Sequence, residues 1–226
     1  MQKEIKNLSE LIDERSLKYD LLSGSSQHWI GLAGGPGSGK STVAGKIKEA
    51  LRDQVDIIPM DGYHYSCSEL NEMENPEQAH ERRGAPFTFN SRKLVDDLIE
   101  ARRTGSGHFP DFDHKERDPV EGRISLKPGK RIVIVEGNYL LLNEHPWNRL
   151  QSEVFDEGWF LYVTLEECKR RVLKRHHQVM KMSREESMWR LMTNDGPNAE
   201  LVIQESIGNA DRLVEIRNHP SGDEVA

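Results

Sequence analysis

The fold of this chain is decided by the stretch Gly34-Gly35-Pro36-Gly37-Ser38-Gly39-Lys40-Ser41. It matches the pattern G-x-x-x-x-G-K-S of a phosphate-binding loop, the Walker A motif. Its glycines let successive backbone N–H groups turn inward toward phosphate oxygens, and the following helix adds its positive N-terminal end. At this spacing, Lys40 reaches the β- and γ-phosphates and the Ser41 hydroxyl holds Mg²⁺. The stretch therefore predicts that the chain binds a nucleoside triphosphate.

The residues on either side supply the strand and the helix that such a loop requires. The apolar run His28–Ala33 precedes the loop and is typical of a buried parallel strand. The expected inward face of the helix that follows consists of Val43, Ile47, Ala50 and Leu51. The candidate nucleotide-binding residues are Gly34, Gly35, Pro36, Gly37, Ser38, Gly39, Lys40, Ser41 and Thr42.

Composition narrows the class of protein. The 226 residues suffice for one large α/β domain. A formal net charge of -7 argues against general binding of nucleic acid, which needs a clustered basic face. Cys67 and Cys168 have no metal-type spacing and are typical of a reducing compartment. The sequence has no long apolar run and an acidic start, so we expect no membrane span, no leader peptide and a cytoplasmic location. Oligomeric state stays open.

Strand and helix patterns alternate along the rest of the chain. Apolar runs predict further strands at Val55–Met60, Arg131–Val135 and Trp159–Val163, and the alternating pattern of Asp211–Ile216 is typical of a last, edge strand. Helical patterns cover residues 3–22, 91–103, 166–180 and 184–193 and a segment from Pro197, whereas 61–90 and 104–129 are polar and irregular. This alternation predicts a doubly wound, mainly parallel α/β sheet. Ligands of such sheets bind beyond the carboxyl ends of the strands.

Carboxylates follow two of the predicted strands. Asp61 comes directly after Val55–Met60, where it could accept a proton from an attacking hydroxyl or bind Mg²⁺ through water. Asp-Gly is also a common turn pair, so a purely structural role for Asp61 stays open. Glu136 follows Arg131–Val135, at the place of a Walker B carboxylate, although Asp is more usual there. The candidate metal ligands are Ser41 and Glu136.

Several segments together resemble one family, the P-loop small-molecule kinases that include uridine kinase, pantothenate kinase and phosphoribulokinase. The segments are residues 34–41, 59–65, 82–89, 110–114, 135–139 and 194–199. The resemblance spans about residues 27–217 and is strongest to the branch of the Yfh7-type ATPases and the fructose-operon kinase. It implies a three-layer P-loop NTPase sandwich, nucleoside kinase-like, over residues 27–226, with acceptor-site insertions at about 62–90 and 104–129 and a helical lid at about 166–193. Residues 1–26 are expected to form a helix that packs on this core.

The resemblance also implies roles for single residues. Asp61 matches the family's proposed base, and Glu136 matches the strand-end Glu that helps to organise Mg²⁺. Residues 109–117 look like the family's acceptor-site hairpin. The acceptor candidates are Tyr63, His64, Arg83, Phe112, Asp113 and His114. A solvated loop would explain the hairpin segment as well, and a surface charge pair would explain Arg82 and Arg83.

The segment 168–177 is strongly basic within an acidic protein, and Arg171, Lys174 and Arg175 share one helical face. In related kinases a lid at this point lays arginines over the transferring phosphoryl group. The chain lacks the Arg-Asp and Arg-Gly pairs of uridine kinase, so which arginine acts stays open. The predicted catalytic residues are Lys40, Asp61, Arg171 and Arg175. Residues 194–199 could border the adenine, or begin a helix capped by Asn194 or Asp195.

These features together imply an ATP- and Mg²⁺-dependent kinase that phosphorylates a hydroxyl group of a small molecule: a nucleoside, a sugar or a pantothenate-like alcohol. The alternative is an ATPase or nucleotide-driven switch that acts on a protein partner, but a switch would not need Asp61, the hairpin and the lid together. The sequence has no guanine-specifying Asn-Lys-x-Asp motif, and Asp61-Gly-Tyr-His argues against a nucleoside monophosphate kinase. The expected partner is a small-molecule acceptor, not nucleic acid or a membrane.

Overall fold

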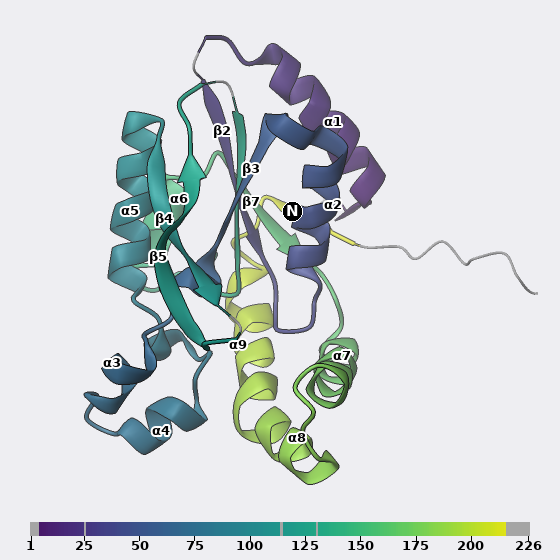
Figure 1. Cartoon of the computed structure of the whole chain (residues 1–226). Coiled ribbons are helices and arrows are strands. Elements are labelled where there is room, and N and C mark those ends of the chain that lie inside the picture. The colour runs from purple at the N-terminus through teal and green to yellow at the C-terminus, as the bar shows by residue number, and fades with distance from the viewer. Residues whose placement is uncertain (1–4, 25, 114, 130, 216–226) are drawn as a thin grey trace, which may run out of the picture.

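A parallel six-stranded sheet forms the centre of the computed structural model, which describes residues 5–24, 26–113, 115–129 and 131–215 (Figure 1). Its strands lie in the order β1-β8-β7-β2-β6-β3. They are β1 (Ile5–Lys6), β2 (Gln27–Ala33), β3 (Val55–Pro59), β6 (Arg131–Gly137), β7 (Glu157–Leu161) and β8 (Arg212–Val214). The pairing and the helices around it confirm the predicted doubly wound α/β fold.

Helices cover both faces of the sheet, which gives three layers. The helices on one face are α1 (Leu8–Leu21) and α2 (Lys40–Leu51), and those on the other are α5 (Ser91–Thr104), α6 (Asn148–Glu153) and α9 (Gly196–Ser206). Alternate residues of β6 enter different cores: Ile132 and Ile134 lie under α1 and α2, and Val133 and Val135 lie under α5 and α6. This explains the unbroken apolar run, since a strand covered on both faces has no solvated side.

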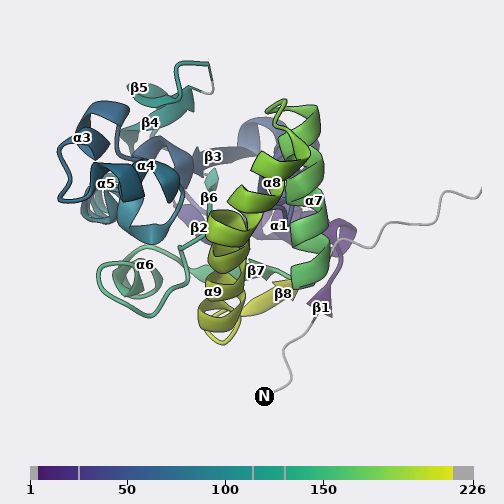
Figure 2. The ribbon, with the colours of Figure 1, turned by 90° about the horizontal axis from the view of Figure 1, so that it is seen from below.

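Shorter elements surround the carboxyl ends of the strands. On one side lie α3 (Cys67–Asn71) and α4 (Pro76–Glu81), and on the other lie α7 (Leu165–Gln178) and α8 (Arg184–Arg190), as the view from below shows (Figure 2). A separate antiparallel pair, β4 (Gly107–Asp113) and β5 (Asp118–Leu126), stands beside α5. Among the described residues, no helix is both long and apolar enough to cross a membrane.

Residues 61–90 and 104–129 are more regular than the sequence pattern indicated. Ser66 begins α3 with a capping box, in which Glu69 returns a hydrogen bond to the cap, and Asn75 caps α4 ahead of Pro76. Both caps can be read from the sequence, but the helices are too short to show a hydrophobic period. The second segment forms β4 and β5, so the expected hairpin extends well beyond residues 109–117.

Three predictions at the edges of the core were wrong. The first helix does not start at residue 3: Asn7 caps α1, and Ile5 belongs to β1. The last strand is not at the edge, because β8 lies between β7 and β1; Ile216 is outside the described residues. On α2, Ala50 is exposed and Ala44 is buried in its place.

The segment at residues 190–197 is one helical rod instead of a turn into a new helix. α8 continues through a π-helical turn, Leu191–Asp195, directly into α9. Because Asn194 and Asp195 both have helical backbone angles and neither side chain makes a cap hydrogen bond, the predicted helix cap was wrong. Pro197 does lie in the first turn of α9, as expected.

Arg15 of α1 lies fully inside the protein, over the ring of Trp159. Its guanidinium donates to Glu157 Oε1 at 2.6 Å. Burial alone would raise the pKa of Glu157, but hydrogen bonds from His28, Trp159 and Arg15 outweigh it and hold this pKa well below its usual range. The hydrogen-bond donors around Glu157 therefore stabilise the ionised form of its carboxylate.

We expect Arg15→Met to lower the free energy of unfolding by about 3 kcal/mol, because a buried carboxylate loses a charged partner. The loss stays at the lower end of the range for such pairs, because Arg212 also contacts Glu157, at 2.9 Å. Urea unfolding at neutral pH measures it. The control is Lys46→Met on the exposed side of α2, which should change stability by less than about 0.5 kcal/mol. Equal effects of the two substitutions would contradict the importance of this buried pair.

Candidate active site

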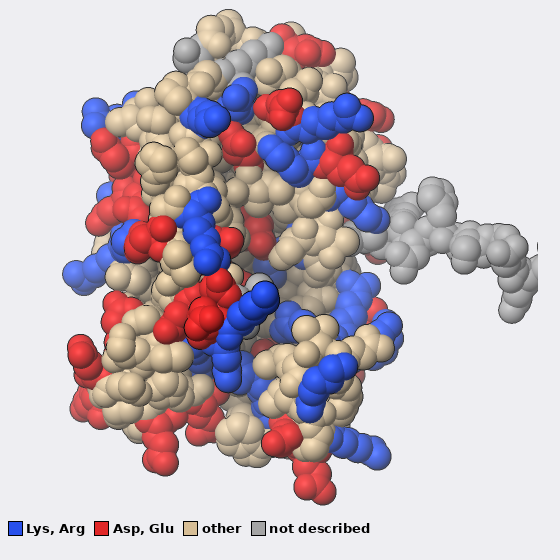
Figure 3. All heavy atoms as spheres, viewed as in Figure 1, with Lys and Arg blue, Asp and Glu red and all other residues tan. Residues whose placement is uncertain are grey.

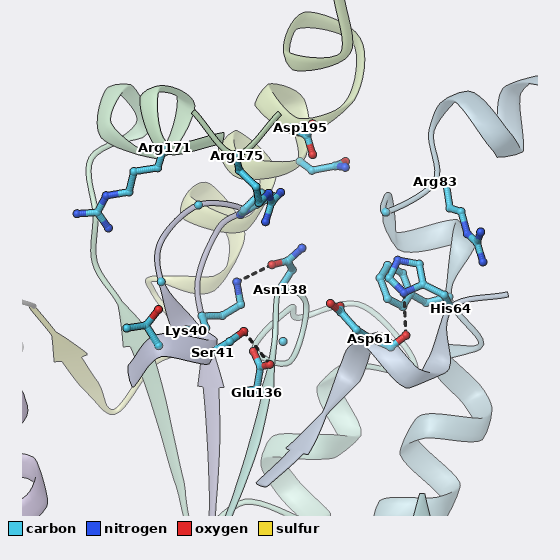
Figure 4. A pocket seen from close by; sticks show the side chains of 18 of the residues that line it. Lys40, Ser41, Asp61, His64, Arg83, Glu136, Asn138, Arg171, Arg175 and Asp195 are labelled. Carbon is cyan, nitrogen blue, oxygen red and sulfur yellow. Dashed lines mark hydrogen bonds between the residues drawn. The ribbon is translucent and has the colours of Figure 1, made fainter. Parts of the chain in front are cut away.

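The carboxyl ends of β2, β3 and β6 open onto a cavity of about 560 Å³ (Figure 4). The predicted site residues that line it are Pro36, Gly37, Gly39, Lys40, Ser41, Thr42, Asp61, His64, Arg83, Glu136, Arg171 and Arg175. The lining also includes Asp195 and Asn198 of the segment predicted to border the adenine, and Phe89, Asn138 and Arg190, for which the sequence analysis gave no individual role. Segments far apart in the chain therefore meet at one place, where the rule for parallel sheets puts a ligand.

The loop between β2 and α2 has the backbone geometry that its glycines permit. Gly37 and Gly39 have φ values of 81° and 96°, a region that side chains with a Cβ avoid. A Cβ at Gly37 would also approach the Cys168 carbonyl oxygen to 2.6 Å. Gly34, Gly35 and Ser38 belong to the loop but do not line the cavity. The loop thus packs directly against α7, and no larger residue fits at Gly37.

Lys40 lies buried at the centre of the site. Its Nζ donates to the carbonyl oxygens of Gly34 at 2.8 Å and Gly35 at 3.2 Å, and to Asn138 Oδ1 at 2.7 Å. Burial lowers the pKa of Lys40, while the charges of Glu136 and Asp61 oppose that shift. The ammonium group is therefore fixed in place by its own loop, inside the cavity that the loop encloses.

Ser41 and Glu136, the predicted metal ligands, lie next to each other beside Lys40. The Ser41 hydroxyl donates to Glu136 Oε1 at 3.0 Å. Burial raises the pKa of Glu136, and the charge of Asp61 adds to the rise, whereas Lys40 and Ser41 oppose it. Hydroxyl and carboxylate oxygens are ligands that Mg²⁺ accepts, and it usually takes further ligands from phosphates and water. The described residues hold no group of three His, Cys, Asp or Glu side chains that could bind a metal by themselves.

Arginines from two helices reach the same cavity. Arg171 donates to the Ser38 carbonyl oxygen at 3.1 Å and to Glu167 at 2.7 Å, so it is tied to the loop. Arg175 lies one turn further along α7, and its positive charge helps to lower the pKa of Lys40. Arg190 of α8 also lines the cavity, although the sequence analysis did not select it. In Figure 3, basic side chains surround the hollow beside α7 and α8, and acidic ones gather over α3 and α4.

Asp61 and His64 face the cavity, whereas Tyr63 does not, because residues 60–63 form a 3₁₀ turn. Side chains three apart on such a turn point the same way. Asp61 and His64 therefore share the cavity side, and Met60 and Tyr63 share the core side. Tyr63 donates to Asp97 at 3.0 Å, and burial, with help from Asp97, raises the pKa of its hydroxyl group.

The other predicted acceptor residues lie on or near β4 and β5. The ring centroids of Phe112 and His64 are 5.0 Å apart, and the ring centroids of His64 and Phe89 are 3.9 Å apart, with both pairs of rings tilted. Asp113 does not line the cavity. It pairs with Arg123 at 2.9 Å and accepts from backbone N–H groups of the hairpin turn, which lower its pKa. His114 lies outside the described residues. Of the five predicted acceptor residues that the structure describes, only His64 and Arg83 are part of the cavity wall.

Buried asparagines connect the two sides of the cavity. Asn194 donates to the Arg83 carbonyl oxygen at 2.9 Å, and Asn198 donates to Asn194 Oδ1 at 2.9 Å. Arg82 donates to both asparagine side chains at 3.3 Å. The motif of residues 194–199 therefore fastens the segment after α4 to the start of α9. Its predicted place beside the adenine stays a prediction.

Comparison with known proteins agrees with this geometry. The family described as "AAA domain" matches residues 30–191. A Schizosaccharomyces pombe protein provisionally named a uridine kinase is 41% identical over 165 residues, which cover 70% of this chain and 69% of that protein. "ATP-dependent kinase YFH7" of Kluyveromyces lactis is 31% identical over 209 residues, which cover 74% of this chain but only 59% of that protein. The crystal structure of a Silicibacter sp. TM1040 protein, provisionally described as a fructose transport system kinase, superposes with a TM-score of 0.77 at 28% identity, covering 92% of this chain and 98% of that one.

Proposed function

The chain belongs to the AAA-domain family of P-loop proteins, among relatives named as kinases, and from this premise we propose that it is an ATP- and Mg²⁺-dependent kinase. Its acceptor would be a hydroxyl group of a small molecule. The observation that carries the proposal is a second, acceptor-type half of the cavity: the Asp61 carboxylate faces the loop lysine across the same space (Figure 4). An enzyme that only hydrolyses ATP does not need a substrate-sized space between the phosphate-binding loop and Asp61.

In the nucleotide half, the triphosphate of ATP would lie in the loop, against the backbone N–H groups and Lys40. Ser41 and Glu136 would hold Mg²⁺, which when bound neutralises charge on the β- and γ-phosphate oxygens. Arg171 and Arg175 reach the cavity from α7 and would stabilise charge on the phosphoryl group as it moves. In this proposal α7 and α8 act as a lid over the phosphates, and the enzyme works in the cytoplasm.

In the acceptor half, Asp61 would accept the proton of the acceptor hydroxyl. At the same time the hydroxyl oxygen would bond to the γ-phosphorus, and the bond between the γ-phosphorus and the ADP oxygen would break. The backbone around Asp61 is fixed: its carbonyl oxygen accepts from the His64 N–H at 3.2 Å and lies 2.8 Å from His64 Nδ1. The carboxylate itself is exposed in the cavity. A fixed backbone and an accessible carboxylate are what a general base needs, because proton transfer depends first on geometry.

A direct test measures ADP release from ATP with and without acceptors, using a panel of nucleosides, sugars, sugar phosphates and vitamin alcohols. We expect at least one acceptor to raise ADP release about tenfold or more, with a matching phosphorylated product by mass spectrometry. The control is the same panel without Mg²⁺. ADP release that is the same with every acceptor and with none would instead favour an ATPase or switch that acts on a protein partner.

A further inference from the structure

Two arginines line the acceptor side of the cavity, and each would normally indicate an anionic substrate. The terminal N–H groups of Arg83 are already engaged within the protein. A guanidinium has four terminal N–H groups and one on Nε. Nη1 donates to Cys67 Sγ at 3.1 Å and to the Arg117 carbonyl oxygen at 2.6 Å. Nη2 donates to the Tyr65 carbonyl oxygen at 2.7 Å and to Asp118 Oδ1 at 3.0 Å. The Nε atom has no hydrogen-bond partner, but it is buried and out of reach of a ligand in the cavity. Arg83 therefore holds the hairpin and has no exposed N–H group for an anion.

Arg190 contacts two groups of the same wall. Its Nε lies 3.4 Å from Asp195 Oδ2, and its Nη2 donates to the Arg83 carbonyl oxygen at 3.3 Å. Asp195 is nearly buried, on the π-helical turn, and also lies 3.0 Å from His176 Nε2. The charge of Arg190 is thus balanced by a carboxylate of the same wall.

Carboxylates face the acceptor space from two directions. Asp61 comes from the end of β3, and Asp195 comes from the opposite wall above the loop (Figure 4). The whole lining has five Lys or Arg side chains against three Asp or Glu side chains, a surplus of two positive charges. A Mg²⁺–triphosphate complex carries about two negative charges, so binding of this complex is enough to balance the whole positive surplus of the lining. Because Arg83 also neutralises Asp118 outside the cavity, no positive charge is left for a second anion.

We propose that the acceptor is an uncharged polyhydroxy compound, such as a free sugar or a nucleoside, whose hydroxyl groups donate to Asp61 and Asp195. This inference rests on the kinase function proposed above. Ionised carboxylates only accept hydrogen bonds, and hydroxyl groups supply the matching donors. A phosphate or carboxylate on the acceptor would supply no donor to these oxygens at that point, and the charge of Asp61 would repel it. Of the two carboxylates, Asp61 is assigned to the proton of the reacting hydroxyl and Asp195 to a neighbouring one.

The first experiment compares neutral and anionic members of matched pairs. The pairs are fructose with its 1- and 6-phosphates, uridine with its 3′- and 5′-monophosphates, and pantothenol with pantothenate. The two phosphates of each sugar leave different hydroxyl groups free. We expect kcat/KM of the neutral member to exceed that of every anionic counterpart by about tenfold or more in whichever pair is used. An anionic member that equals or exceeds its neutral counterpart would overturn the inference and leave the kinase function intact. No transfer to any member, while Mg²⁺-ATP still stabilises the protein, would overturn both.

The second experiment changes the charge of Asp195 and keeps its size. Asp195→Asn should raise KM for the neutral acceptor about tenfold and reduce the discrimination against its anionic counterpart about tenfold, with KM for ATP nearly unchanged. The control is Glu200→Gln on the exposed side of α9, which should leave all three values as they are. A structural defect would change the kinetics of ATP and of both acceptors together. Unchanged discrimination between the paired acceptors would remove Asp195 from the assignment.

Discussion

Lys40→Ala is expected to abolish phosphoryl transfer, with a fall in kcat of about 10³-fold or more, because the charge at the centre of the cavity is removed. Among the described residues, Lys40 is the only basic side chain that donates a hydrogen bond to the carbonyl oxygens of Gly34 and Gly35. ATP affinity should fall as well. For the unchanged protein, Mg²⁺-ATP at about 100-fold excess over Kd should stabilise the fold by about 2.7 kcal/mol. Thermal unfolding with and without Mg²⁺-ATP measures how much of this gain the variant loses.

The matched control for Lys40→Ala is Lys46→Ala, on the same helix but exposed to solvent. It should keep both turnover and the stabilisation by Mg²⁺-ATP. Lys40 itself lines the cavity, so water can enter the space that its side chain leaves and replace the ammonium group, and the variant should fold. Near-native turnover of Lys40→Ala would mean that the loop does not bind the phosphates of the reacting nucleotide.

Asp61→Asn is expected to lower phosphoryl transfer by about 10²–10⁴-fold, the usual contribution of a positioned general base. Affinity for ATP should stay within a few-fold, since the amide keeps the size of the carboxylate and removes one negative charge from the cavity. Background hydrolysis of ATP, in which water is the nucleophile, should fall less than transfer to the acceptor. Parallel measurements of ADP release and phosphorylated product separate the two rates.

The comparison of those two rates decides between the roles that the sequence left open for Asp61. Equal losses of hydrolysis and transfer would indicate that Asp61 organises Mg²⁺, because both reactions need the metal. Unchanged transfer would exclude Asp61 from the reaction. Glu69→Gln, at the cap of α3 and outside the cavity, controls for the loss of a carboxylate in this region.

The sequence was most informative where the structure is local. The strand, loop and helix around residues 27–51 follow each other directly, so the motif and the apolar pattern predict them together. Glu136 and Asp61 were selected by the same logic, because a residue that follows a buried strand has little choice of position. Their chemical roles stay predictions until the variants are measured.

Side-chain direction could not be read from neighbouring residues in the same way. Tyr63 and His64 are adjacent in the chain, yet a 3₁₀ turn sends one into the core and the other into the cavity. Arg83 resembles a substrate-binding residue in sequence, but two of its partners, Arg117 and Asp118, come from the hairpin more than 30 residues later. Arg190 and Asp195 reach the cavity only because α8, the π-helical turn and α9 form one rod. Such long-range packing leaves no local pattern.

That rod also limits how this part of the chain can change in length. A π turn holds one residue more than an α turn, and each residue of a helix advances the chain by about 100° of rotation. Loss of a single residue within 191–195 would convert the turn to an α turn and rotate α8 by that amount relative to α9. Arg190 would then swing out of the cavity while α9 stayed in the core. In a surface loop an insertion or deletion only lengthens or shortens a connection. Here the number of residues sets the rotation of α8 relative to α9.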